Sequence, residues 1–95
     1  MSIHLLVTFT AKPDKVSAFS EILEQVKFDL PKKDGCQGVR ILHKVGNHRE
    51  FTLLETWKSE DFHKRHIEEV IESGGWEFIL SHLTSEPVSS YYNEI

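Results

Sequence analysis

Apolar residues recur along this chain with two different periods, and the change of period divides it into strands and helices. Residues 3–11 are rich in Leu, Val, Thr and Phe, which is typical of a β-strand. Between residues 16 and 30, apolar side chains instead recur every three or four positions, which predicts a helix with one buried stripe. Pro31 ends that helix, and the polar residues 32–35 predict a turn.

The second half of the chain repeats this order of strand and helix. Residues 38–45 and 50–57 are strand-like and are joined by a short turn, which predicts an antiparallel hairpin. A helical pattern with apolar side chains at four-residue spacing follows the hairpin. The Ser-Gly-Gly sequence at 73–75 interrupts this helix, and a last strand is predicted at 88–92.

The predicted order of elements is therefore β-α-β-β-α-β. Two split βαβ units of this kind indicate an α+β, ferredoxin-like fold, in which both helices cover one face of a four-stranded antiparallel sheet. The opposite face also carries apolar side chains, since Leu6 and Leu54 alternate with residues on the helix side. A second copy of the same sheet would cover them, so we expect a homodimer.

The composition places the chain in the ordinary globular class. With 95 residues, 39% of them hydrophobic and 27% charged, it is predicted to form a single domain over residues 1–95. The net charge is −4 and no stretch concentrates Lys and Arg, so no nucleic-acid or membrane partner is expected. A single cysteine, no signal-peptide pattern and no bilayer-length apolar run together predict a cytoplasmic location.

The third predicted strand carries the residues most suggestive of chemistry. Alternate positions on a strand share one face, and here they hold Phe51, Leu53, Glu55 and Trp57. Glu55 is the one acid on this face, and His66 lies in the apolar stripe of the next helix. Buried charge must be paired or neutralised. Either Glu55 and His66 satisfy each other in a packed core, or they line a pocket where the imidazole exchanges protons near neutral pH.

Three aromatic residues are open to two interpretations in the same way. Trp57 is either a core residue or a wall that stacks on an aromatic ligand. Tyr91 and Tyr92 point to opposite faces of the last strand. One hydroxyl is therefore placed to reach a pocket, while packing in a dimer interface is the alternative role for these rings.

The histidines do not form a recognisable metal motif. His63 and His66 lie three residues apart on one helix and are therefore near each other. A zinc site needs three or four ligands at suitable spacing, and the sequence contains no such pattern. It also contains no glycine-rich phosphate-binding loop. We therefore expect neither a metal nor a cofactor. His82 is expected at a surface or at a helix end.

Short motifs spread over nearly the whole chain resemble the antibiotic biosynthesis monooxygenase (ABM) domain family. Each motif is degenerate, but their order and spacing together fit the family pattern without a gap between residues 35 and 66. The matching positions are Lys12-Pro13-x-Lys15 with Phe19, Gly35-Cys36, and Phe51-x-Leu53-x-Glu55-x-Trp57 followed by His66.

This resemblance implies a dimeric α+β barrel made of two ferredoxin-like sheets. It also implies an oxidoreductase: a cofactor-independent monooxygenase that oxidises a quinol- or phenol-like aromatic with O₂. By the resemblance, His66 is the proton acceptor and Glu55 its orienting partner. The substrate-binding residues it implies are Trp57, Phe51, Phe62, Tyr91 and Tyr92.

Two other functions remain open at this point. One is a non-oxidative isomerase of a small ketone or signal-sugar derivative, with His66 as a proton shuttle. The other is a non-catalytic ligand-binding dimer. Relatives that degrade haem use an asparagine on the first strand, which residues 4–10 lack, so haem degradation is not expected. The segment from His66 to Trp76 is about one helical turn longer than in the family, beside the expected pocket.

Overall fold

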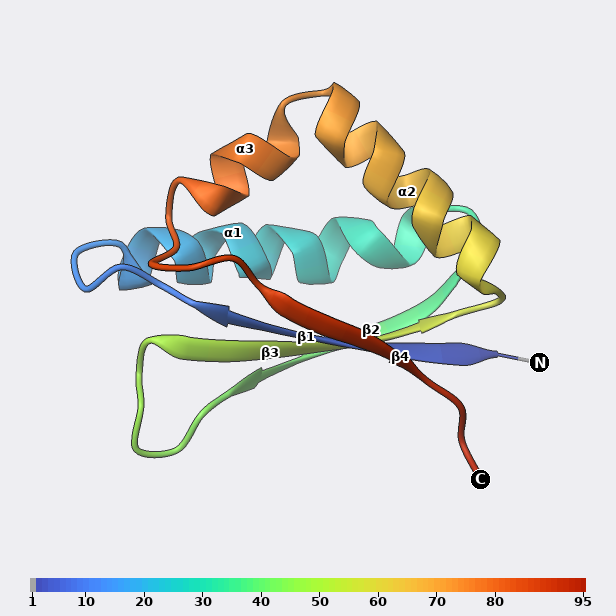
Figure 1. Ribbon diagram of the computed structural model, residues 1–95, viewed down its shortest axis with the longest axis horizontal. Coiled ribbons are helices and arrows are strands. Elements are labelled where there is room, and N and C mark those ends of the chain that lie inside the picture. The colour runs from blue at the N-terminus through green and yellow to red at the C-terminus, as the bar shows by residue number, and fades with distance from the viewer. Residues whose placement is uncertain (1) are drawn as a thin grey trace.

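The computed structural model describes residues 2–95 as a four-stranded antiparallel sheet with its helices on one face (Figure 1). Residue 1 of the predicted domain lies outside the described part. The strand order is β2-β3-β1-β4, which confirms the predicted α+β ferredoxin-like fold. The elements are β1 (Ile3–Thr10), α1 (Val16–Asp29), the 3₁₀ turn η1 (Leu30–Lys32), β2 (Cys36–His43), β3 (Glu50–Trp57), α2 (Glu60–Glu72), α3 (Gly75–Leu80) and β4 (Val88–Tyr92).

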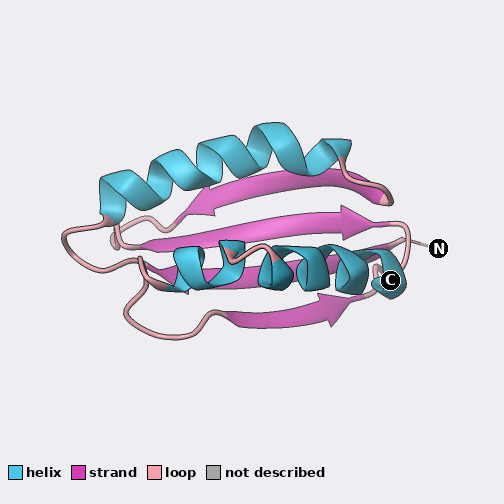
Figure 2. Cartoon of the chain, turned by 90° about the horizontal axis from the view of Figure 1, so that it is seen from above, coloured by secondary structure: helices cyan, strands magenta, loops and turns pink. Residues whose placement is uncertain are grey.

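The helices form one layer above the sheet. Figure 2 shows α1 lying beside the α2–α3 pair across the sheet. The predicted interruption is confirmed, since α2 ends at Glu72 and α3 begins at Gly75. Gly74 adopts a φ of +82° between them, a conformation that side chains other than glycine rarely take. No helix among residues 2–95 is long and apolar enough to cross a membrane.

The second strand begins and ends two residues earlier than the sequence pattern predicts. β2 starts at Cys36, which pairs with Trp57, and a bulge separates this pair from the next one, Gly38 with Thr56. Alternation of polarity does not reveal such a bulge, because the bulge changes the pairing and not the composition. The observed bounds of β3 and β4 agree with the predicted ones.

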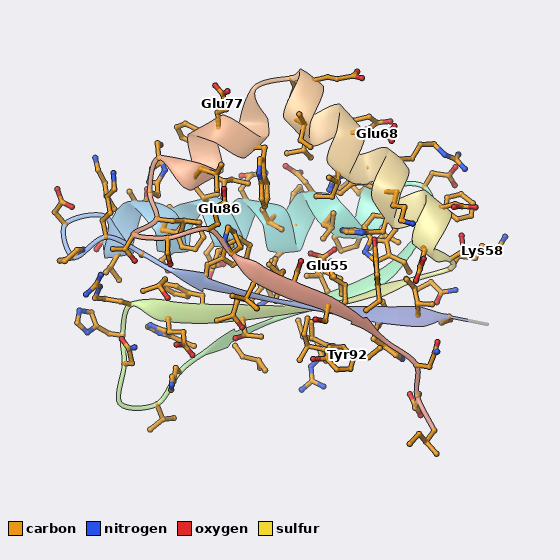
Figure 3. The ribbon with its side chains drawn as sticks, in the orientation of Figure 1. Glu55, Lys58, Glu68, Glu77, Glu86 and Tyr92 are labelled. Atoms are coloured by element: carbon orange, nitrogen blue, oxygen red, sulfur yellow. The ribbon has the colours of Figure 1, made fainter. Side chains whose placement is uncertain are left out.

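The register of the sheet sets the position of Glu55. Glu55 pairs with Leu5 of β1 on one side and with Val39 of β2 on the other, while Leu5 also pairs with Tyr91 of β4. One row of side chains therefore crosses all four strands on the helix side. Figure 3 shows Glu55 on that side and Tyr92 on the opposite side of the sheet.

The hydrophobic core lies between α1 and the sheet. Phe19 of α1 is 1% exposed, and its ring centroid lies 5.3 Å from that of Phe9 and 5.5 Å from that of Phe51. Tilted and edge-on aromatic pairs at such distances are favourable beyond the area they bury. This cluster fills the end of the interior that is distant from Trp57, because Phe9 and Phe51 pair with each other at the far end of β1 and β3.

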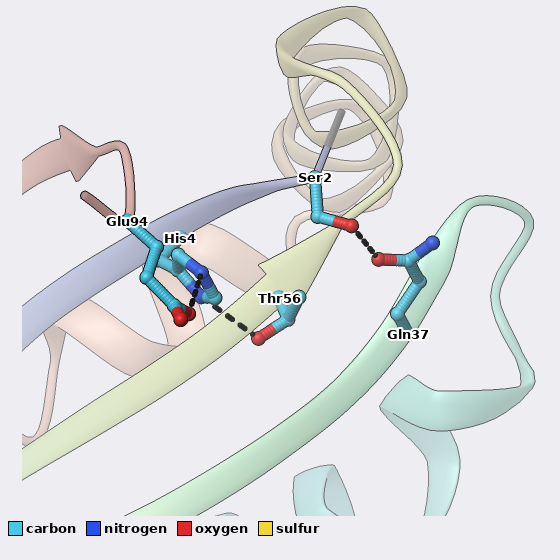
Figure 4. A network of polar contacts seen from close by, with 5 residues as sticks. All are labelled: Ser2, His4, Gln37, Thr56 and Glu94. Carbon is cyan, nitrogen blue, oxygen red and sulfur yellow. Dashed lines mark hydrogen bonds and ion pairs between the residues drawn. The ribbon is translucent and has the colours of Figure 1, made fainter.

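The opposite face of the sheet mixes apolar and polar side chains. Its exposed large apolar residues are Leu6, Leu42, Val88 and Tyr92. At the end of the sheet near the chain termini, Nδ1 of His4 lies 3.1 Å from Oγ1 of Thr56, and its Nε2 lies 3.5 Å from the carboxylate of Glu94 (Figure 4). Beyond this polar end, apolar side chains alternate with polar ones such as Thr8 and Thr52, whose hydroxyls lie 3.1 Å apart.

Candidate functional site

A cavity of about 340 Å³ lies between the helices and the sheet. This volume falls within the range of small-molecule sites. Its walls are mainly apolar and come from β1, β3, α1, α2 and α3, with Phe19, Leu53 and Val70 as examples. The titratable side chains in the lining are Asp29, Lys33, Glu55 and His66. Of these, Glu55 and His66 are the two that the sequence predicted to be catalytic.

Glu55 reaches the cavity from the centre of the sheet. The residue is 6% exposed, and its Oε1 accepts a hydrogen bond of 2.8 Å from the indole Nε1–H of Trp57. Burial raises the pKa of this carboxyl above its ordinary value, and the Trp57 hydrogen bond partly opposes that rise. Glu55 is thus an acid held at the wall of an apolar space.

His66 reaches the same cavity from the middle of α2. Its imidazole stacks on the indole of Trp57, with ring centroids 5.4 Å apart and an interplanar angle of 29°. Its Nδ1 is buried and has no hydrogen-bond partner within residues 2–95. Burial, followed by the positive charge of Lys33, lowers the pKa of His66, so the neutral imidazole predominates near pH 7.

Trp57 and Phe51 do not line this cavity. Trp57 is 0% exposed and lies between two imidazoles, those of His63 and His66, with both ring centroids 5.4 Å away. Phe51 belongs to the aromatic core and stacks on His43 at 4.3 Å. In this structure Trp57 is hydrogen-bonded to Glu55 and stacked on His66. Contact of Trp57 or Phe51 with a ligand stays a prediction.

Phe62 lies on the outer side of His66. It lines a second, smaller pocket of about 90 Å³, together with His66 and four charged residues. These are Lys33, Asp34, Arg65 and Glu69. Lys33 and His66 line both pockets, so the imidazole of His66 separates the apolar cavity from a charged depression.

The two tyrosines point to opposite faces, as the alternation predicts. Tyr92 lies on the open face and is 50% exposed. The hydroxyl of Tyr91 lies 2.6 Å from Nδ1 of His63 on the helix side, outside the cavity lining. Burial raises the pKa of Tyr91, with smaller contributions from Glu60 and Glu55. Neither tyrosine hydroxyl therefore reaches the cavity in this structure.

His63 is the site residue to which sequence reasoning gave no role beyond a metal ligand. It is 7% exposed, and burial, with a smaller effect of His66, lowers its pKa to about 4. Its edge packs on Trp57 and its ring meets Tyr91. The sequence shows that His63 lies one helical turn before His66. That spacing does not identify its hydrogen-bond partner, Tyr91 of β4.

Metal binding finds no support in the arrangement of the side chains. Among the residues that the structure describes, no three or more His, Cys, Asp or Glu side chains are grouped to hold a metal ion.

His82 follows the end of α3, but it is buried and not on the surface. Its Nδ1 lies 2.8 Å from the carbonyl oxygen of Phe78, and its ring packs near Phe19. A role in capping and packing explains this histidine.

Comparison with known structures places the same fold in proteins of low sequence identity. A conserved protein from Methanosarcina mazei Go1 is 22% identical, with a TM-score of 0.87 over 100% of this chain and 94% of its own. Rv0793 from Mycobacterium tuberculosis is 17% identical, with a TM-score of 0.86 over 100% and 96% of the two chains. A mutant of SnoaB, a cofactor-independent oxygenase from Streptomyces nogalater, is 10% identical, with a TM-score of 0.82 over 98% and 92%.

A family model identifies the relationship more directly than these structures do. A search of curated proteins found no significant match. The model described as antibiotic biosynthesis monooxygenase matches residues 2–69, which include both Glu55 and His66. The match ends before α3, so the helix that contributes Trp76, Phe78 and Ile79 to the cavity lining lies outside it. This chain belongs to the antibiotic biosynthesis monooxygenase family.

Proposed function

We propose that this protein is a cofactor-independent monooxygenase that oxidises a quinol- or phenol-like aromatic with O₂, with His66 as the proton acceptor. The observation that carries the proposal is the buried, unpartnered Nδ1 of His66 on an imidazole that lines an apolar cavity. Membership of the family supports a monooxygenase-type function. The cofactor-independent chemistry of the structurally similar SnoaB supports the finer statement.

The first step is removal of the phenolic proton. A general base must be unprotonated before it can accept a proton. The lowered pKa of His66 keeps its imidazole neutral near pH 7. The resulting phenolate is electron-rich and transfers electrons to O₂. The apolar walls limit water around this anion, which favours reaction with O₂ over reprotonation.

The overall reaction balances without an external reductant. The substrate loses its phenolic hydrogen and one ring hydrogen and gains one oxygen atom at the ring carbon. The second oxygen atom leaves as water with those two hydrogens. The four electrons that O₂ accepts come from the substrate, and the product is a quinone. A bicyclic ring system is a suitable size for a cavity of about 340 Å³.

Glu55 acts on the substrate side of this reaction. Its carboxyl lies on the same cavity as His66 and is placed to hydrogen-bond a substrate hydroxyl. The expected hydrogen bond between Glu55 and His66 does not occur in this structure: the carboxylate accepts from Trp57, and Nδ1 of His66 has no partner among the described residues. Orientation of the imidazole therefore comes from its stacking on Trp57.

O₂ uptake with hydroquinone and naphthohydroquinone tests the proposal. The wild-type protein should consume O₂ faster than the buffer does, and His66→Ala should lower the rate by about 10²- to 10⁴-fold, the usual contribution of a general base. His48→Ala is the matched control, since His48 is exposed in the β2–β3 turn and far from the cavity. Uptake at the buffer rate by both wild type and His66→Ala would overturn the proposal.

The same samples distinguish the alternatives. Proton exchange into a small ketone without O₂ uptake would indicate an isomerase that uses His66. Binding of an aromatic probe with neither reaction would indicate a non-catalytic module. The presence of a cavity beside His66 favours an enzyme or a ligand-binding protein over a core in which the imidazole is packed on every side.

We infer that the protein acts as a homodimer through the open face of the sheet. Leu6, at 36% exposure, and Leu42, at 50%, lie on this face with Val88 and Tyr92. In an isologous dimer the same patch of both copies meets, so these apolar side chains would cover one another. Light scattering should give twice the 11.0 kDa of one chain. Leu6→Lys should produce monomers, while Val45→Lys, at a 97% exposed turn position, should not. A monomeric wild type would contradict the dimer.

A further inference from the structure

We propose that Trp57 is a positioning residue whose indole N–H holds the Glu55 carboxylate at the wall of the cavity. This inference deepens the proposed function, on which it rests for the identity of the cavity as the substrate site. It differs from the prediction that Trp57 stacks on the ligand, because the ring does not line the cavity.

The hydrogen bond joins two side chains on the same face of one strand. Trp57 lies two residues after Glu55 on β3, so both side chains point toward the helices. The distance from Nε1 to Oε1 is 2.8 Å, which is normal for a strong bond to a carboxylate. The geometry therefore depends on the local backbone of a central strand and not on a mobile loop.

The donor itself is fixed on both sides. The imidazole of His66 stacks on the indole, and the ring of His63 meets it at 61°. Trp57 is 0% exposed and contacts two side chains of α2, so close packing restricts its ring. The position of one oxygen of Glu55 is fixed in turn. Within the described chain, no side chain other than Trp57 forms a hydrogen bond with this carboxylate.

The use of a carboxylate at this place argues against a purely structural pair. A buried indole N–H needs an acceptor, but a neutral amide or hydroxyl oxygen would serve at lower cost than an ionisable acid. A fixed carboxyl that also lines a cavity is arranged to meet a ligand. Phenylalanine keeps an aromatic ring at this place but is smaller and lacks the donor, so its packing loss is separated from the lost hydrogen bond by the Glu55→Gln comparison below.

Other titratable groups also face Glu55, and none of them among residues 2–95 is hydrogen-bonded to its carboxylate. His66 of α2, Asp29 of α1 and Lys33 after η1 line the same cavity, while Cys36 of β2 and Tyr91 of β4 are electrostatically coupled to Glu55. A change in the titration of Glu55 is therefore assigned to the Trp57 hydrogen bond only by comparison with matched variants.

Nuclear magnetic resonance on the whole protein tests the bond without any substrate. The chain has two tryptophans, so the indole N–H signal of Trp57 is assigned by its loss in Trp57→Phe and its retention in Trp76→Phe. In the wild type, the chemical shift of this signal should change with pH at the same midpoint as the ¹³C resonance of the Glu55 carboxyl group. His63 and His66 also pack on the indole and titrate, so the wild-type shift contains their contribution as well. In Glu55→Gln the part of the shift that follows the Glu55 carboxyl should vanish, and in Trp57→Phe the carboxyl should titrate at higher pH.

Thr52→Val is the matched control for the titration. Thr52 lies on the same strand and its hydroxyl bonds to Thr8 on the opposite face, so this variant also loses one hydrogen bond while β3 keeps its packing toward the helices. Its Glu55 titration should equal that of the wild type. If the chemical shift of the Trp57 indole N–H changes neither with pH nor in Glu55→Gln, the proposal is overturned. This readout does not require a folded Trp57 variant, because the signal is also assigned by its retention in Trp76→Phe.

Kinetics then separate positioning from packing. With an active quinol, Trp57→Phe should lower kcat about tenfold or more, with a smaller change in KM, and Trp57→Phe/Glu55→Gln should be no worse than Glu55→Gln alone. Additive losses would show that Trp57 acts independently of Glu55 and would overturn the proposal. If no quinol is oxidised, the proposed reaction fails, but the indole titration still decides the role of Trp57.

Discussion

Glu55 and His66 line the same cavity, one from the sheet and one from α2, yet the Glu55 carboxylate bonds to Trp57 and not to the imidazole. The two ionisable groups are thus connected through the tryptophan, which is hydrogen-bonded to one and stacked on the other. Each group keeps an unfilled hydrogen-bonding capacity beside an apolar space, an arrangement suited to a ligand with one polar end.

The charges around the outer pocket should tune the titration of His66 in opposite directions. Lys33 lowers the pKa of His66 and Glu69 raises it. Lys33→Gln should therefore move the midpoint of the His66 imidazole resonance to higher pH, and Glu69→Gln should move it to lower pH. Lys32→Gln is the control, because the Lys32 amine lies over the ring of Phe28 at 3.8 Å. Shifts of the same sign for Lys33→Gln and Glu69→Gln would contradict this electrostatic account.

His63 should make the protein less stable in acid. Its folded-state pKa of about 4 is below its ordinary value of 6.5, so the unfolded chain binds more protons between these values. Stability contributed by neutral His63 is present above pH 6.5 and is lost as the pH falls toward 4. His63→Gln should cost about 1–2 kcal/mol near neutral pH through its bond to Tyr91. Urea unfolding at several pH values should show this deficit shrinking in acid, and a constant deficit would count against it.

Filling the cavity should block ligand binding while leaving the protein folded. Val70 lines the cavity from α2, one turn after His66, and Phe at this position would occupy part of the open volume. Val70→Phe should weaken naphthol binding at least about tenfold, with a stability change within about 1 kcal/mol. Fluorescence titration and thermal unfolding measure the two effects. The exposed Val45 provides the matched control, Val45→Phe, which should bind naphthol normally. Tight binding by a well-folded Val70→Phe protein would place the ligand elsewhere.

Gly35 should tolerate substitution much less well than Gly46. Both have a positive φ, +82° and +87°, so alanine at either costs about 1–2 kcal/mol in backbone strain. A Cβ on Gly35 would also lie within 2.5 Å of Phe62, whereas Gly46 has open space around it. Gly35→Ala should therefore destabilise the protein by about 1–3 kcal/mol more than Gly46→Ala does. Denaturant unfolding of the two variants checks this, and equal losses would show that Phe62 simply moves aside.

Local sequence patterns were sufficient to place Glu55 and His66 on facing elements. Alternation along β3 puts Glu55 on the helix side, and the apolar stripe of α2 includes His66. Which partner each would find could not be read from these patterns. The choice of Trp57 over His66 for Glu55 depends on side-chain directions and on the distance between α2 and the sheet, and periodicity specifies neither.

The sequence by itself determined the order of elements, the ferredoxin-like topology, the interruption of the second helix and the face on which each strand residue lies. These follow from local periods and from turn residues such as Gly74, which adopts a positive φ that other residues rarely take. The tertiary structure decided which polar side chains meet: Trp57 with Glu55, Tyr91 with His63, and His66 with no partner at Nδ1. The contacts of His63 and His66 join α2 to the sheet, so they depend on how the helix layer packs on the sheet, and that packing is a property of the whole fold.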